Sequence, residues 1–179
     1  AWQQEPLYDL RTAIRYARAL EKHNVLWLEE PLPHFNYPEL SSQLCQAVDI
    51  PIAGGGAMFG LHTYKTVLEK GALDIVQPDV QYAGGISEVR RIALLAEFYG
   101  RTCIPHFFGP GIALAATLQV IGATSIPWVE YNYHPSVYSI EVRDCMLKEP
   151  IRIDEEGFIR IPDRPGLGVE VDENIIEKY

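Results

Sequence analysis

The chain is poor in cysteine, and no two cysteines stand at the spacing that a zinc or thiol redox motif requires. The three that are present, Cys45, Cys103 and Cys145, are odd in number and far apart, which also argues against a disulfide framework. We interpret them as reduced, buried side chains of a cytoplasmic protein. Free cysteine behaves as a small apolar residue, and disulfides are rare in that compartment.

Positive charge is scarce as well. The chain has 15 Lys and Arg against 24 Asp and Glu, a formal net charge of −9 at pH 7. We therefore expect neither a nucleic acid nor an anionic membrane as a partner, because both attract cationic proteins.

Long apolar runs are absent too. The longest apolar stretch, residues 111–123, is too short to cross a bilayer and is typical of a buried helix, and no secretory signal is visible. The sequence begins without Met, and we expect it to be a piece of a longer polypeptide.

Short apolar segments recur at a period that suits one strand, one helix and two loops. They end near five residues, spaced 24, 23, 28 and 25 positions apart: Glu29, Ala53, Val76, Ile104 and Val129. Between them apolar residues recur at helical spacing, in the ranges 7–23, 37–48, 61–70, 86–99 and 112–121. The apolar segments do not alternate with polar residues, which is typical of parallel strands covered on both faces. The pattern predicts an α/β fold.

Two architectures fit this alternation, a doubly wound sheet and a (β/α) barrel. A dinucleotide-binding doubly wound sheet favours GxGxxG after an early strand, but Gly54-Gly55-Gly56 is followed by Ala57-Met58-Phe59. A barrel accounts better for ionisable side chains at several strand ends. We predict that residues 1–150 form the later part of a (β/α) barrel, because five strands cannot close an eight-stranded barrel, and that the first strands lie upstream.

The last residues, 151–179, change in pattern. Two short alternating segments, 151–153 and 158–161, flank the turn sequence Asp154-Glu155-Glu156-Gly157, which predicts a hairpin. We expect this tail to pack outside the barrel or on another domain of the protein.

Four predicted strands each end in an ionisable residue: Glu29, Asp79, His106 and Glu130. In a (β/α) barrel these ends converge on one pocket. A carboxylate beside an imidazole makes a general base, so His106 with Asp79 is the candidate catalytic pair. For either residue alone, a structural histidine or a turn-capping aspartate is the more common explanation.

The acidic residues allow further roles. Glu29 is a candidate ligand for Mg²⁺, which prefers hard oxygen donors, and Glu30 stands beside it at the rim. Glu130 could be a ligand, a hydrogen-bond partner of a developing enolate, or an ion-paired structural acid.

Two further histidines follow these strand ends. His34 lies just beyond Glu30 and His134 just beyond Glu130, so both are candidates for contact with substrate. For His23 and His62, which lie near helix ends, we favour a structural role.

The motifs taken together resemble a known family. They are Trp27-Leu28-Glu29-Glu30-Pro31, Gln77-Pro78-Asp79, Gly84-Gly85-Ile86, Pro105-His106, Trp128-Val129-Glu130 and Pro165-Gly166-Leu167-Gly168. Their order and spacing resemble the mandelate racemase subgroup of the enolase superfamily (mandelate racemase/muconate lactonizing enzyme-like), from about residue 1 to the end of the chain. The resemblance implies that residues 1–150 are roughly strands 4 to 8 of a TIM-like (β/α)7β barrel, and that residues 151–179 pack outside it or on an N-terminal capping domain.

The resemblance implies Mg²⁺ held by three acids on successive strands, and an enediolate made by removing a proton α to a carboxylate. It assigns Glu29 as a metal ligand, His106 and Asp79 as the catalytic dyad, and Glu130 as the acid that supports the enolate. The family's third ligand is a Glu, and Gly56 stands in its place here. Losing an anionic ligand weakens Mg²⁺ binding. The first ligand would lie upstream of Ala1.

The resemblance also narrows the reaction. Other branches carry a Lys on the sixth strand, and residues 73–80 contain none. We predict a lyase that dehydrates an acid sugar, with a small-molecule carboxylate as substrate and with Glu30, His34, Gly56 and His134 in contact with it. The family often assembles into homo-oligomers. The alternatives are a racemase or epimerase of a hydroxy acid, and a metal-poor relative that binds a ligand without turning it over.

Overall fold

The computed structural model describes residues 8–33, 38–126, 128–136 and 138–178, and within them a parallel sheet lies beneath a row of helices. The strands are β1 (Leu28–Glu29), β2 (Ile52–Gly54), β3 (Ile75–Val76) and β4 (Thr102–Cys103), hydrogen-bonded in the order β1-β2-β3-β4. Leu28 pairs with Ile52, Ala53 with Ile75, and Ile75 with Thr102. All four carboxyl ends therefore lie at one edge of the sheet.

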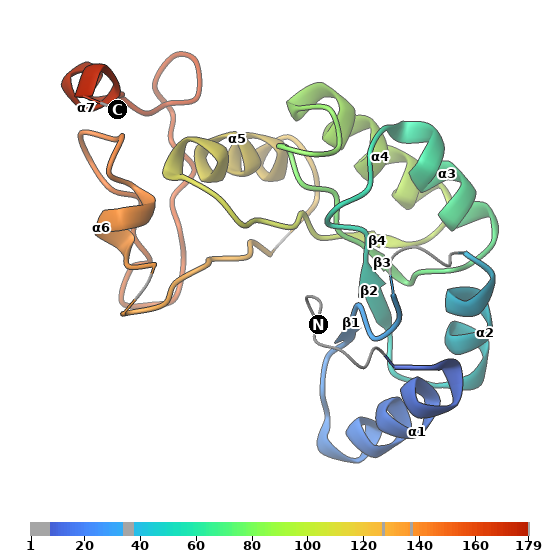
Figure 1. Ribbon diagram of the computed structural model, residues 1–179. Helices are drawn as coiled ribbons and strands as arrows, with labels where there is room; N and C mark the ends of the chain where they lie inside the picture. The colour runs from blue at the N-terminus through green and yellow to red at the C-terminus, as the bar shows by residue number, and fades with distance from the viewer. Residues whose placement is uncertain (1–7, 34–37, 127, 137, 179) are drawn as a thin grey trace.

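Helices precede and connect these strands, as the apolar spacing predicts. They are α1 (Leu10–Leu20), the 3₁₀ turn η1 (Glu21–His23), α2 (Glu39–Ala47), α3 (Leu61–Glu69), α4 (Ile86–Phe98) and α5 (Gly111–Gly122). Figure 1 shows α1 to α4 along the outer side of an arc, with the strands on its inner side. The short α6 (Ile140–Arg143) and α7 (Glu173–Lys178) follow at the other end of the molecule and were not predicted.

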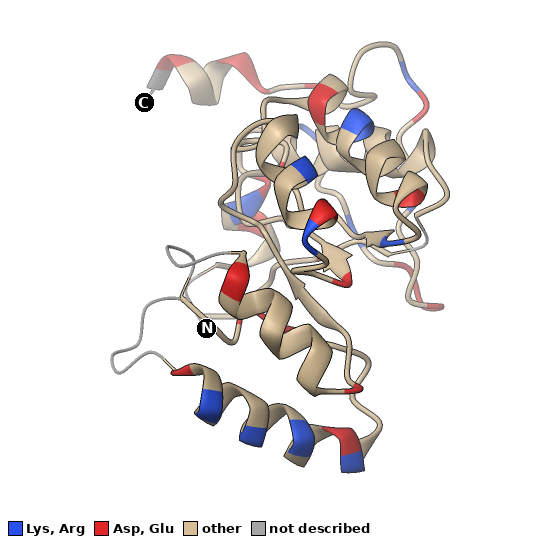
Figure 2. Ribbon diagram, turned by 90° about the vertical axis from the view of Figure 1, so that its right-hand side faces the viewer, with Lys and Arg blue, Asp and Glu red and all other residues tan. Residues whose placement is uncertain are grey.

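Local signals set several helix boundaries. Asp9 begins α1, since its side chain accepts a 2.7 Å hydrogen bond from the N–H of Thr12. Gly71 and Gly100, just beyond the last residues of α3 and α4, have φ of 58° and 65° and end those helices. In α1 the small residues Ala13 and Ala17 are buried, and Figure 2 shows Lys and Arg along the outer side of this helix.

Both faces of the sheet carry buried apolar side chains. Ile52 and Val76 belong to the main core under the helices, whereas Ala53, Ile75 and Ile104 form a smaller cluster on the opposite face. Trp27 packs on this second cluster, and its ring meets that of Trp128 edge-on at 6.2 Å. Because Trp27 precedes the first strand and Trp128 follows the last, the sheet is curved, as part of a barrel wall must be.

The strand predicted to end in Glu130 is not present in residues 128–130, and Pro127 lies outside the described residues. Glu130 meets the segment beyond β4 through its side chain, which accepts the N–H of Phe107 at 2.7 Å. This side-chain bond joins the two segments without a ladder of backbone hydrogen bonds. The prediction of a strand is therefore wrong for residues 128–130, which the apolar pattern alone does not reveal.

The tail departs from its prediction in part. The turn at 154–157 forms, with the N–H of Asp154 donating to the carbonyl of Phe158 at 2.8 Å, but the flanking segments are not strands. Most of these residues are exposed, and two isolated strands without a covered face are only marginally stable. The tail is tied to α5, because the amide of Gln119 donates to the carbonyls of Pro162 and Leu167.

The cysteines differ in burial. Cys103 is buried and Cys45 half-buried, but Cys145 is exposed, so the expectation of three buried thiols is wrong for that residue. Burial raises the pKa of the Cys45 and Cys103 thiols to about 12, which keeps both protonated. Among the described residues, no helix is both long enough and apolar enough to cross a membrane.

Candidate active site

Asp79 and His106, from the segments that follow β3 and β4, form a buried pair. The His106 Nδ1 lies 2.8 Å from the Asp79 Oδ2. The Asp79 side chain is fully buried and that of His106 is 11% exposed. Because an ionised carboxylate only accepts hydrogen bonds, we assign the proton to Nδ1, which leaves Nε2 as the ring nitrogen for proton transfer. The structure therefore brings the two predicted residues to hydrogen-bonding distance, and their catalytic role stays a prediction.

Asp79 also organises the turn that follows it. Its Oδ1 accepts the N–H of Gln81 at 2.7 Å, and its carbonyl accepts the N–H groups of Tyr82 and Ala83. The turn-capping and catalytic explanations of Asp79 are thus not alternatives. One oxygen of the carboxylate caps the turn, and the other holds the imidazole.

The pKa of His106 is set by opposing effects. Burial lowers it, but the hydrogen bond that His106 donates to Asp79 and the negative charges of Glu130, Asp79 and Glu29 outweigh burial, so the pKa is raised above its ordinary value. An imidazole in these surroundings takes up a proton readily and is stabilised as imidazolium.

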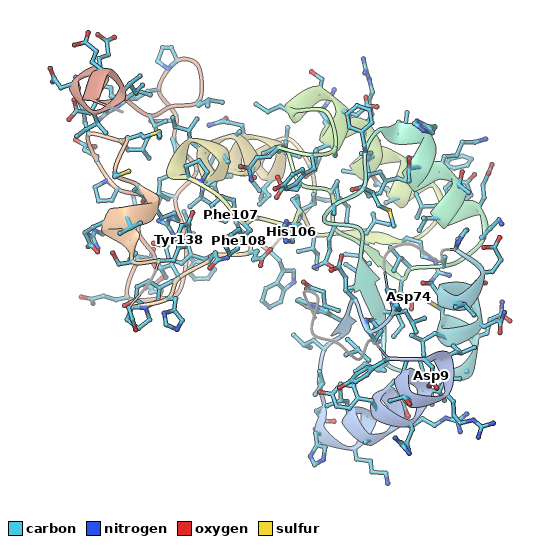
Figure 3. The ribbon with its side chains drawn as sticks, in the orientation of Figure 1. Asp9, Asp74, His106, Phe107, Phe108 and Tyr138 are labelled. Atoms are coloured by element: carbon cyan, nitrogen blue, oxygen red, sulfur yellow. The ribbon has the colours of Figure 1, made fainter. Side chains whose placement is uncertain are left out.

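Glu130 lies beside this pair in the segment after α5. Its Oε2 accepts the 2.7 Å hydrogen bond from Phe107, the residue after His106. Burial raises the pKa of Glu130, and the charges of Glu29 and Asp79 add to the effect, against the Phe107 N–H and His106, which lower it. Figure 3 shows His106 and Phe107 together near the middle of the molecule, apart from Asp74.

Asp74, which precedes β3 at the opposite edge of the sheet, has a different role. It pairs with Arg101 and accepts the N–H of Ile52 at 3.0 Å. These contacts fasten neighbouring strands at their amino ends. The candidate site residues lie at or beyond the carboxyl ends, where a barrel carries its active site.

The two acids at the carboxyl end of β1, Glu29 as its last residue and Glu30 just beyond it, bind different partners. Glu29 is exposed, and its Oε2 accepts a 2.8 Å hydrogen bond from the buried amide of Gln77. Glu30 is half-buried with φ of 44°, and its Oε1 accepts the N–H of Gly55 at 3.3 Å. Glu29 is one of the negative charges that raise the pKa of His106.

The residues that the structure describes do not form a magnesium site on their own. Among them no group of three or more His, Cys, Asp or Glu side chains is arranged to hold a metal ion. At Gly56, where the resemblance expects the third ligand, a Cβ atom would lie 2.8 Å from Cδ2 and 2.9 Å from Cγ of His106. The imidazole thus occupies the space into which a ligand side chain would extend.

The two histidines predicted to contact substrate, His134 and His34, are not joined to the His106–Asp79 pair by any described contact. His134 is exposed, and its Nδ1 accepts the N–H of Ser136 at 3.3 Å within a local turn. His34 lies outside the described residues. Nothing in the described contacts joins His134 to the dyad, so its contact with substrate stays a prediction.

Sequence reasoning gave no role to two glutamines that bind the predicted acids. Gln77 donates to Glu29, and Gln81 donates to Asp79 through both its backbone and its side chain. Their position next to Asp79 was the available signal. Nothing in the sequence tells which atoms they meet.

The family model of the enolase C-terminal domain-like family matches residues 2–175, almost the whole chain. The chain belongs to this family. Its fold is shared with solved members of the enolase superfamily. The 3,6-anhydro-D-galactonate cycloisomerase from Zobellia galactanivorans superposes with a TM-score of 0.85 at 34% identity, covering 96% of this chain and 47% of that one. A mandelate racemase/muconate lactonizing enzyme from Sulfitobacter sp. gives 0.84 at 32% identity, covering 94% and 41%.

Curated relatives of this enolase-superfamily chain are sugar-acid enzymes. It is 36% identical to the arabinonate dehydratase of Saccharolobus solfataricus over 97% of its own length and 45% of that protein. It is 41% identical to the D-galactonate dehydratase of Variovorax paradoxus over 89% of its length and 42% of that protein. The chain therefore spans about half the length of the curated relatives it matches. The expected superfamily and barrel fold are confirmed.

Proposed function

We propose that the protein is a lyase that dehydrates an acid sugar. The observation that carries the proposal is the buried His106–Asp79 pair at 2.8 Å, with Glu130 held beside it by the N–H of Phe107. Two relatives are named as dehydratases of arabinonate and D-galactonate, which supports this reaction over others of the superfamily.

The His106–Asp79 pair suits a reaction in which the same imidazole first removes a proton from carbon and then gives that proton to an oxygen. Neutral His106 takes the α-proton of a 2,3-dihydroxy acid at Nε2, and the electron pair of the C–H bond passes to the enediolate. The imidazolium, held by Asp79, then returns the proton to the β-hydroxyl, which leaves as water when the C–O bond breaks. The enol product tautomerises to a 2-keto-3-deoxy acid.

The raised pKa of His106 supports both steps. Asp79, Glu130 and Glu29 stabilise the imidazolium and so favour proton removal from carbon. Glu130 stabilises the imidazolium when it is ionised; its raised pKa makes the protonated form accessible at higher pH than for an ordinary Glu, and in that form its O–H donates to the enediolate oxygen.

The resemblance implies Mg²⁺ as cofactor, but the described side chains supply only Glu29 of the expected ligands. We assign no step to the metal. Calorimetric titration of the full-length protein with Mg²⁺, with and without sugar acids, measures whether residues elsewhere complete a site.

The test of the function is product formation. Full-length protein would be incubated with arabinonate, D-galactonate and related sugar acids, with and without Mg²⁺, and the 2-keto product followed as its semicarbazone. The expected result is keto-acid formation from at least one sugar acid, lost in His106→Asn. Racemisation or epimerisation without keto acid would refute dehydration and favour the isomerase alternative.

One observation favours a second candidate, a relative that binds its ligand without turnover. Gly56 removes a ligand position, and the His106 ring covers it. Tight binding of a sugar acid with neither keto acid nor isomer formed would support this candidate.

A further inference from the structure

Gln81 joins the two loops that carry the catalytic pair. Its side-chain Nε2 donates to Asp79 Oδ1 at 3.2 Å, approaches Oδ2 at 3.4 Å, and donates to the carbonyl of Phe108 at 3.1 Å. Its backbone N–H donates to Asp79 Oδ1 at 2.7 Å. Phe108 stands two residues after His106. One amide therefore bridges the loop of the acid and the loop of the base.

The chemistry of this bridge requires a neutral group with two N–H donors. The carboxylate of Asp79 and the carbonyl of Phe108 both accept hydrogen bonds, and a primary amide donates to both at once. A carboxylate at position 81 would face two acceptors and donate to neither. A thioether would fill the same space without any donor.

Gln81 is exposed, but one side of its amide lies directly against the loop after His106. A Cβ on Gly109 would lie 2.5 Å from Oε1 and 2.6 Å from Nε2 of Gln81, so the amide packs directly against the glycine. From the other side, Tyr138 stacks on the Phe108 ring at 5.5 Å with an interplanar angle of 10°, and its hydroxyl donates to the Gly109 carbonyl. Figure 3 shows Phe108 and Tyr138 side by side.

We propose that Gln81 is a positioning residue that holds Asp79 and His106 at bonding distance by fixing the two loops relative to each other. Gln81 satisfies one oxygen of Asp79 and so leaves the other for the imidazole. Its bond to Phe108 prevents the His106 loop from moving away. The effect on turnover rests on the proposed function, whereas the effect on the imidazole does not.

The groups that face His106 from the surrounding elements are Asp79, Glu130 and Glu29, with Gly56 against the ring. Gln81 is neutral, so replacing it by methionine leaves the charge around the imidazole unchanged. A change in the tautomer or the titration of His106 in that variant therefore reports a change in the position of the ring relative to Asp79, not a change in nearby charge.

The experiment is ¹⁵N NMR of the histidine rings in the full-length protein, with the His106 signals assigned from His106→Asn. In the wild type above the pKa of His106 we expect the Nδ1–H tautomer, held by Asp79. In Gln81→Met we expect averaging between the two tautomers, and a midpoint of titration at lower pH because the bond to Asp79 is weakened. Gln46→Met is the matched control, since Gln46 is exposed on α2 and bonds only Ser42 among the described contacts. It should leave the His106 signals unchanged.

A second variant approaches the same contact from the opposite side. Gly109→Ala places a methyl group on the amide of Gln81 and should give the same averaging of tautomers. If sugar-acid turnover is found, kcat should fall by about 10- to 100-fold in both variants with little change in KM, the size expected for a misplaced catalytic group.

The outcomes separate the two proposals. Wild-type tautomer and titration of His106 in both Gln81→Met and Gly109→Ala would overturn the role of Gln81, whatever the activity. Averaged tautomers in a protein that turns over no sugar acid would support the role of Gln81 and count against the proposed function alone.

Discussion

Adding a single methyl group at Gly56 should disturb the catalytic pair. The new Cβ would lie 2.8 Å from Cδ2 and 2.9 Å from Cγ of His106, whereas carbon atoms pack at about 3.5 Å or more. The ring must then move by roughly 0.7 Å unless the backbone gives way. That is more than the 2.8 Å bond from His106 Nδ1 to Asp79 can lengthen before it passes about 3.2 Å.

The expected magnitudes follow from the two interactions involved. Inserting a methyl group into a packed site destabilises the fold by about 1–3 kcal/mol. A hydrogen bond to a charged group contributes about 1.5–3 kcal/mol, and weakening it lowers the pKa of His106. Gly56→Ala should therefore lower both the free energy of unfolding and the pH at which His106 titrates.

Chemical unfolding and NMR titration of His106 measure the two effects. Gly122→Ala is a control, because the three atoms nearest to its Cβ would all belong to the flexible Ile161 side chain, the first of them Cδ1 at 3.0 Å. Gly56→Glu carries the same Cβ and should displace the ring in the same way, without gaining Mg²⁺ affinity. Wild-type titration of His106 in Gly56→Ala, or tight Mg²⁺ binding by Gly56→Glu with the His106–Asp79 bond intact, would refute this reasoning.

Glu130→Gln and Arg143→Met, with Arg152→Met as an exposed control, test how buried charges affect the stability of the fold. Because Glu130 has a raised pKa in the folded state, the fold binds this proton more tightly than the unfolded chain and loses stability as the pH rises through that pKa. Glu130→Gln should remove this part of the loss, measured by chemical unfolding at about pH 4 and pH 7, and should lower the pKa of His106 by removing a nearby negative charge; an unchanged pH dependence would contradict this. Arg143→Met should destabilise the fold by about 3–5 kcal/mol, because it leaves the buried carboxylate of Asp144 without its 2.7 Å partner. The exposed Arg152→Met should change stability by only about 0–1 kcal/mol, and equal effects in both arginine variants would show that burial does not decide the result.

Several parts of the site were predictable because they depend on short-range pattern. The strand and helix period follows from local apolar spacing, and parallel strands bring all their carboxyl ends to one edge. The prediction that His106 and Asp79 lie together follows from those two facts. It needs no knowledge of exact packing, since the residues end neighbouring strands.

The contacts that need exact packing could not be predicted. The sequence shows a glycine at position 56, but not that the His106 ring lies against it. It shows Gln81 two residues after Asp79, but not that the amide reaches the Phe108 carbonyl.

The sequence by itself thus determined the order of elements as far as α5, the kind of fold and the meeting of His106 with Asp79 beyond the sheet, because these depend on residue spacing along the chain. Tertiary structure alone decided which oxygen of Asp79 binds the imidazole and how Glu130 is held without a strand. It also decided what space remains beside Gly56. Those outcomes depend on sheet curvature and on contacts of less than 4 Å between segments that are distant in the sequence. The spacing of residue types along the chain does not encode such contacts.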